Sequence, residues 1–265
     1  MKMQMPRHKR IMLLISIYSA SVFLSEFVYA RSLNLNVPNN QAKAVTRLVE
    51  AQCNSKLPCG WYSIDEGTIG FRGGIENSKT FQSFLKFYKQ GKTKKIIVNS
   101  LGGAAFDGIA IGEIVVRDKL HVIVDGYCMS SCANYLFSLA KTKTINGLVA
   151  FHGSVTSNQS QTPDAWGNLN PVRYLANLSL ASKERELFKD QLRTYTFISK
   201  TGRASSGINE WTIYSTRELE SNGFSAINGT VDMNFACFLK TYFEADGNKQ
   251  KISPHSRAVL NHCGQ

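Results

Sequence analysis

The sequence predicts an α/β fold in which a parallel sheet is flanked by helices. From residue 68 on, short apolar segments alternate with helical patterns, and glycines stand at the junctions between them. A content of 43% hydrophobic and 19% charged residues over 265 positions is that of a globular protein with one sizeable core. It excludes an intrinsically disordered chain, a multi-pass membrane protein and a fibrous rod.

The first 30 residues are typical of a secretory signal peptide. Residues 1–10 are basic, residues 11–24 form an apolar run, and Val28-Tyr29-Ala30 resembles a cleavage site. Because a membrane-spanning helix needs about 20 apolar residues, we expect cleavage and export to the periplasm or beyond the cell. The alternative is an uncleaved helix that anchors the exported chain.

All six cysteines follow the predicted cleavage point, and their even number predicts up to three disulfides in an oxidising compartment. The pairing with the shortest loops is one of many possible connectivities. It joins Cys53 to Cys59, Cys128 to Cys132 and Cys237 to Cys263. No spacing of cysteine and histidine is typical of a zinc site, so we expect no metal.

The elements are predicted in order along the chain. Residues 31–67 form a polar, cysteine-containing segment with one helix at 41–51. A strand at 68–75 ends in glycines and begins the sheet. Residues 77–90 place aromatic side chains at helical spacing, and Gly91 is the stop signal.

The centre of the predicted sheet comes next. Buried strands are expected at 95–100, 120–125 and 148–151, with helices at 104–119 and 131–141 between them. Since a helix separates each strand from the next, the strands are expected to pair in parallel.

The remaining chain is less regular. Residues 153–181 are rich in Ser, Asn, Gln and Pro and predict a loop or insertion, and 182–200 predict one long amphipathic helix. We expect the main domain to span 68–232 and a cysteine-containing tail to span 233–265.

Three of the predicted strands end in residues suited to chemistry, at the edge where open α/β sheets bind ligands. Gly102 and Gly103 can turn N–H groups into a cleft, Ser130 and Ser131 stand at a strand-to-helix junction, and His152 follows a strand. These are the parts of an acyl-transfer site. Each also has a simpler explanation, since the serines could cap a helix, the glycines could form a turn and the histidine could be a buried polar residue.

Taken together, these motifs resemble the ClpP/crotonase superfamily, and within it the proteolytic subunit of the Clp protease and its exported relatives. The shared order is Asn-Ser-x-Gly-Gly at 99–103, Gly-x-x-x-Ser at 126–130, Ala-Lys-x-Lys at 140–143 and a histidine at 152. The resemblance covers about 68–152 and implies a βαβ spiral with a parallel sheet and flanking helices.

The resemblance implies a serine hydrolase that cleaves peptide bonds. Ser130 matches the family nucleophile and His152 the general base. The amides of Gly102, beside Gly103, and of Ser131 match the oxyanion hole. The resemblance implies no cofactor, a peptide or protein substrate and a homo-oligomer, and export disfavours the coenzyme A chemistry of some relatives.

The third member of the catalytic triad is missing from its expected place. The region that aligns with the family's aspartate, residues 202–212, holds Glu210 as its one acid. Three alternatives stay open: Glu210 orients His152, the pair works with a backbone carbonyl, or the site is degenerate. Lys183 is an alternative base. The related signal peptide peptidases use a lysine far downstream in place of the histidine, and Lys183 lies at a comparable spacing.

A Cys128–Cys132 disulfide would clamp the turn that presents Ser130, and two separate thiols are the alternative.

The rival function is a catalytically inactive binding or scaffold protein of the periplasm. The net charge of +12 has no nucleic-acid motif beside it, so we expect a solvated basic face, no nucleic-acid partner and at most peripheral contact with an anionic envelope surface.

Overall fold

The structure is a computed structural model. It describes residues 42–52, 59–154, 171–201, 210–245, 251–260 and residue 263, all within one unit, Asn40–Gln265. The predictions for the signal peptide, for Cys53 and for residues 155–170 lie outside this part of the chain. No helix in the described ranges is long and apolar enough to cross a membrane.

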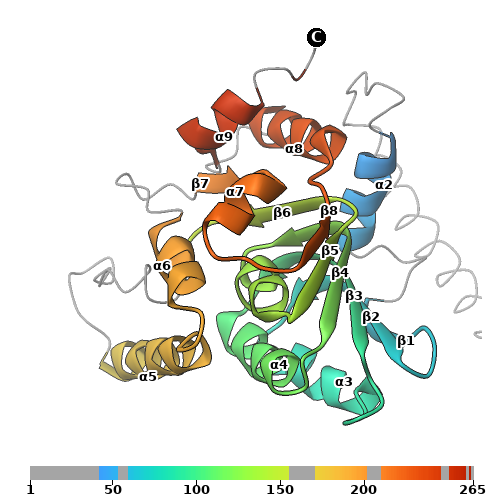
Figure 1. Ribbon diagram of the computed structural model, residues 1–265, viewed down its shortest axis with the longest axis vertical. Coiled ribbons are helices and arrows are strands. Elements are labelled where there is room, and N and C mark those ends of the chain that lie inside the picture. Colours follow the sequence, from blue (N-terminus) through green and yellow to red (C-terminus); the bar gives the residue numbers. More distant parts are fainter. Residues whose placement is uncertain are drawn as a thin grey trace, which may run out of the picture. The chain divides into compact units, whose positions relative to one another are not determined.

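A mostly parallel sheet forms the centre of the described unit (Figure 1). Its main path runs β1-β2-β3-β4-β6-β7-β9, while β5 pairs with β4 and β8. Only β1 with β2 and β6 with β7 pair antiparallel among the described strands. The strands are β1 (Gly60–Ser63), β2 (Thr68–Ile75), β3 (Lys95–Gly103), β4 (His121–Met129), β5 (Thr142–Ile145), β6 (Leu148–Phe151), β7 (Glu210–Ile213), β8 (Ile227–Gly229) and β9 (Lys251–Ile252). The predicted α/β class and parallel sheet are confirmed.

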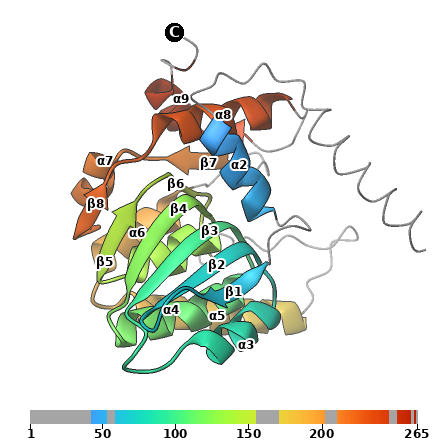
Figure 2. The ribbon, with the colours of Figure 1, turned by 90° about the vertical axis from the view of Figure 1, so that its right-hand side faces the viewer.

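Helices cover both sides of this sheet. They are α2 (Ala42–Ala51), α3 (Lys79–Phe87), α4 (Ala105–Arg117), the π-helix η2 (Cys132–Phe137), α5 (Pro171–Leu187), α6 (Leu192–Lys200), α7 (Thr216–Ser221), α8 (Met233–Ala245) and α9 (Pro254–Val259). In Figure 2, α3 and α4 lie below the strands, and α2 and α8 above them. Because both faces of the sheet are covered, a strand at its centre can be apolar on both faces, as in β6, where all four residues are apolar and buried.

Several element predictions need correction. The strands at 68–75 and 148–151 have the predicted bounds, but residues 171–181, predicted as loop, are helical in α5. The predicted helix at 182–200 is two helices, since α5 ends at Leu187 and α6 begins at Leu192. The reason is visible in the packing, because Phe188 is fully buried whereas Leu192 is 66% exposed, so these side chains do not form one apolar stripe.

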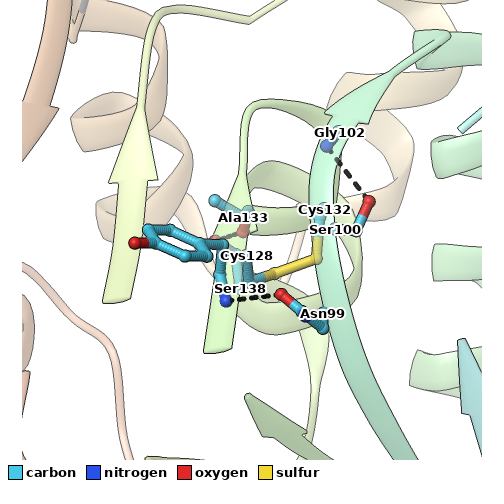
Figure 3. The surroundings of a disulfide bond; sticks show 8 residues. Asn99, Ser100, Gly102, Cys128, Cys132, Ala133 and Ser138 are labelled. Atoms are coloured by element: carbon cyan, nitrogen blue, oxygen red, sulfur yellow. Dashed lines mark hydrogen bonds between the residues drawn. A yellow bond between two sulfur atoms is a disulfide. The ribbon is translucent and has the colours of Figure 1, made fainter. Parts of the chain in front are cut away.

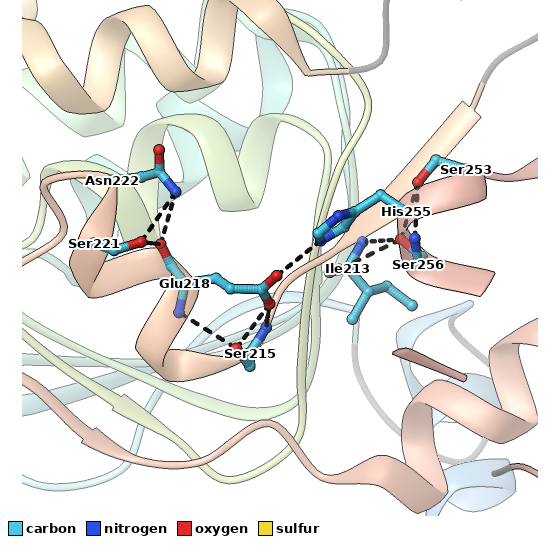
Figure 4. A network of polar contacts seen from close by, with 8 residues as sticks. All are labelled: Ile213, Ser215, Glu218, Ser221, Asn222, Ser253, His255 and Ser256. Carbon is cyan, nitrogen blue, oxygen red and sulfur yellow. Dashed lines mark hydrogen bonds and ion pairs between the residues drawn. The ribbon is translucent and has the colours of Figure 1, made fainter. Parts of the chain in front are cut away.

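The segment predicted as a tail folds back onto the sheet. There β9 pairs with β7, and the Ile213 N–H donates to Ser256 Oγ at 2.7 Å (Figure 4). Glu218 forms a capping box with Ser215 at the start of α7 and contacts His255 Nε2 at 3.0 Å. These contacts join α9 to the main domain.

A buried carboxylate joins α3 to α4. Asp107 is fully buried, and its two oxygens each accept a backbone N–H at 2.8 Å, one from Ser78 and one from Phe81. Replacing Asp107 with alanine is expected to lower the free energy of unfolding by about 3 kcal/mol, because charge-assisted bonds are lost and two buried donors stay unpaired. Urea denaturation measures this. A matched Asp65→Ala variant, which removes an acceptor from the exposed turn at Gly67, should unfold close to wild type; equal losses in both would contradict this account.

Candidate active site

A bulge in β4 directs the end of this strand toward β6. The pairing of β3 with β4 jumps from Val98↔Val124 to Ser100↔Cys128, and Gly126 has a φ of 126° at this point. Asn99 Oδ1 accepts the Tyr127 N–H at 2.9 Å and so holds the bulge. Beyond it, β4 leaves β5 and pairs with β6. The residues that follow β4 and β6 are therefore brought to the same edge of the sheet.

Ser130 occupies this edge in a strained conformation. Its φ is 53°, a left-handed value that costs a serine about 1–2 kcal/mol. The Ser130 N–H donates to Ala150 O on β6 at 3.1 Å, and the Ser130 carbonyl accepts the Asn134 N–H at 2.8 Å. The serine is thus fixed at a sharp strand-to-helix turn, and it stays partly exposed.

A disulfide spans this turn. Cys128 and Cys132 are bonded, with Cα atoms 5.2 Å apart, and Figure 3 shows the bridge between the end of β4 and the following helix. Cys237 is bonded to Cys263, and Cys59 is also in a disulfide. Two of the predicted pairs are therefore confirmed, and the predicted partner of Cys59 lies outside the described residues.

Gly102 packs directly against the Ser130 turn. A Cβ atom on Gly102 would lie 2.3 Å from Met129 O, 2.6 Å from Ser130 Cβ and 3.0 Å from the Ser131 nitrogen. Only glycine permits this approach, and its φ of 83° also favours glycine. The Gly102 N–H donates to Ser100 Oγ at 3.1 Å (Figure 3). The structure therefore places two of the predicted amides, those of Gly102 and Ser131, beside Ser130.

Gly103 faces the other way. A Cβ atom on Gly103 would lie 2.3 Å from Ile75 O, and Gly103 pairs with Ile75 in β2. The structure thus brings Gly103 to the neighbouring strand, and Gly102 to the serine.

His152 follows β6 and is half-buried. Its ring packs roughly perpendicular to the Trp211 ring, with centroids 4.3 Å apart. Burial lowers the pKa of the His152 imidazole from its ordinary value of 6.5, so the ring is neutral at pH 7 and able to accept a proton. Trp211, which sequence reasoning missed, supplies part of this burial.

The His152 imidazole is expected to titrate below 6.5 in an NMR experiment. A Trp211→Leu variant should move this pKa up toward 6.5, because the ring gains contact with water. The depressed pKa also means that stability falls as the pH drops through 6.5, since the unfolded chain binds a proton that the folded chain resists. Trp61→Phe, at a buried tryptophan of β1, is the control; a His152 pKa that moves equally in both variants would contradict a role for Trp211.

The structure does not bring Glu210 to His152. The pairing Ala150↔Ile213 and Phe151↔Thr212, continued by one residue, sets Trp211 opposite His152, in agreement with their ring contact. Side chains alternate along a strand, so Glu210 starts from the other face. No hydrogen bond or ion pair joins Glu210 to His152 in the described residues. Lys183, the alternative base, has its Nζ 5.9 Å from the centre of the Phe106 ring.

No group of three or more potential metal ligands gathers in the described part of the chain.

No protein-family model matches the chain, and no curated protein matches it. Among solved structures, the ClpP protease catalytic domain from Plasmodium falciparum is similar, with 16% sequence identity and a TM-score of 0.36. The match covers 59% of this chain and 81% of that chain. A similarity this low identifies no active-site residue.

Proposed function

We propose that this protein is an exported serine hydrolase that cleaves peptide bonds, with Ser130 as nucleophile and His152 as general acid and base. The observation that carries the proposal is the strained Ser130 turn, packed against Gly102 at the sheet edge that His152 shares. A left-handed serine at a strand-to-helix junction directs its hydroxyl away from the chain, and strain of this kind is concentrated at functional sites.

The reaction needs only groups that are near this edge. Ser130 Oγ attacks the carbonyl carbon of the substrate while His152 takes the hydroxyl proton. The carbon–nitrogen bond then breaks, and the amine leaves with the proton from the imidazolium. Water hydrolyses the acyl-enzyme by the same steps and restores the serine. Lowering of the His152 pKa by burial keeps the imidazole neutral and ready for the first step.

Backbone amides are expected to stabilise the oxyanion. The Ser131 N–H lies in the first turn of a helix, where no acceptor within the helix is available, and the helix dipole favours negative charge there. The Gly102 N–H lies close by but donates to Ser100 Oγ. This hydrogen bond must break before the Gly102 N–H can donate to the oxyanion. Each such donor contributes roughly 2.7–4 kcal/mol to the transition state.

The engaged Gly102 amide favours a second candidate, a catalytically inactive protein of the same fold that binds peptides or acts as a scaffold. No carboxylate is bonded to His152 in the described residues, which agrees with this alternative too. The disulfides fit an exported location for both candidates, since such bonds persist in oxidising compartments.

Labelling with a fluorophosphonate separates the two candidates. An active serine displaces fluoride to form an Oγ–phosphorus bond and passes its proton to the histidine. We expect mass spectrometry to find the label on Ser130 of the oxidised protein, and none on Ser130→Ala. Ser131→Ala is the matched control, because the proposal uses only the backbone of Ser131. A folded, oxidised protein that takes no label would exclude the hydrolase.

A further inference from the structure

Asn134 makes contacts on both sides of the candidate site. It is 3% exposed and belongs to η2, the π-helix that follows Ser130. Its backbone N–H donates to the Ser130 carbonyl at 2.8 Å. Its side-chain Nδ2 donates to the carbonyl of Gly153, the residue after His152, at 2.5 Å. One buried residue thus hydrogen-bonds to the nucleophile and to the peptide that follows the base.

We propose that Asn134 is a positioning residue that fixes His152 relative to Ser130 through the Gly153 carbonyl. The inference rests on the proposed function. Since Glu210 forms no hydrogen bond or ion pair with His152 in the described residues, another residue must hold the base in place. An aspartate triad member orients the imidazole ring itself. Here the Trp211 ring packs against the imidazole, and Asn134 holds the main chain beside it.

The chemistry of the Asn134 side chain supports a role beyond packing. Its Oδ1 is buried and has no hydrogen-bond partner in the described structure. An unpaired buried acceptor costs about 1–3 kcal/mol, and an apolar residue of similar size would avoid this cost. The asparagine is therefore poorly explained by stability alone. Its donor Nδ2, which holds Gly153, explains why an amide occupies this position.

The test compares Asn134→Leu and Asn134→Asp with Ser138→Ala. Leucine removes the donor but keeps the number and branching of the side-chain heavy atoms, and aspartate keeps the shape but offers an acceptor to the Gly153 carbonyl. Ser138 is also fully buried, and its Oγ donates to Ala133 O at 2.6 Å, so its loss disturbs the same helix without touching the site (Figure 3). With a chromogenic peptide substrate, we expect kcat to fall roughly 100-fold in both Asn134 variants, the effect of misplacing a reacting group by about 1 Å. KM should stay near the wild-type value, and Ser138→Ala should keep its kcat.

A second measurement does not depend on hydrolysis. Diethyl pyrocarbonate modifies accessible neutral imidazoles, and peptide mapping reports the rate at His152. Freeing the Gly153 peptide should make this modification roughly tenfold faster in Asn134→Leu than in wild type or Ser138→Ala, because local opening becomes easier.

These readouts separate the failure of the inference from the failure of the proposed function. A wild-type protein without hydrolysis or fluorophosphonate labelling overturns the function, and the modification rate at His152 still tests Asn134. Unchanged modification in Asn134→Leu overturns the positioning role, as does an equal increase in Ser138→Ala. In an active protein, an unchanged kcat in the Asn134 variants overturns it as well.

Discussion

Substituting Ser130 with alanine is expected to lower the hydrolysis rate by roughly 10³- to 10⁶-fold while leaving the fold intact. The substitution removes the attacking oxygen and nothing that holds the turn, because the Ser130 bonds to Ala150 and Asn134 come from the backbone. The disulfide beside it is also retained. Steady-state kinetics on a peptide or ester substrate, with thermal unfolding as a check on folding, measures the effect.

The His152→Ala variant should lose about as much activity as Ser130→Ala. Residues that act as one unit are strongly non-additive, so the double variant should be no slower than either single variant. Lys183→Met serves as the control for the alternative base and should keep the wild-type rate, because Lys183 Nζ lies over Phe106. If Lys183→Met abolishes activity and His152→Ala does not, the assigned base is wrong.

The sequence predicted the centre of the fold well for a physical reason. Strands such as β6 are buried on both faces, so they consist of short apolar runs that stand out between glycines and helices. β5 was missed because it contains Lys143, which looks like a surface residue. The structure buries this lysine to 2% exposure, with Nζ donating to Ala140 O at 2.6 Å. Burial lowers its pKa to about 8. The burial of Lys143 was not predictable, because the sequence does not show that the Ala140 carbonyl would accept a hydrogen bond from its ammonium group.

The candidate site was predictable where it depends on topology. Ser130 and His152 follow strands that pair in parallel, and such strands end at one edge of the sheet. The partners of His152 were not predictable in the same way. Trp211 reaches the imidazole through antiparallel pairing of β7 with β6, across a long separation in the chain. Asn134 lies in a helix whose residues are all buried, where an amide looks like part of the core.

Replacing Gly102 with alanine is expected to reduce the hydrolysis rate by roughly 100-fold or more, about the cost of losing one oxyanion-hole donor. The new methyl group would collide with Met129 O at 2.3 Å and with Ser130 Cβ at 2.6 Å. Met129 O and the Ser131 nitrogen belong to the main chain of the Ser130 turn, so they cannot move aside without shifting this turn. The loss of activity should therefore appear mainly in kcat. Kinetics and fluorophosphonate labelling both measure it.

Gly91→Ala is the matched control for this variant. Gly91 has a φ of 77°, close to the 83° of Gly102, but a Cβ atom there would meet nothing within 4 Å. Both substitutions strain a left-handed backbone and should lower stability by about 1 kcal/mol for that reason. The collision with Ser130 is peculiar to Gly102, so Gly91→Ala should keep its rate. A Gly102→Ala protein that folds and hydrolyses substrate at the wild-type rate would show that the approach of β3 to the serine has no part in catalysis, and the assignment of the Gly102 amide to the oxyanion would then be wrong.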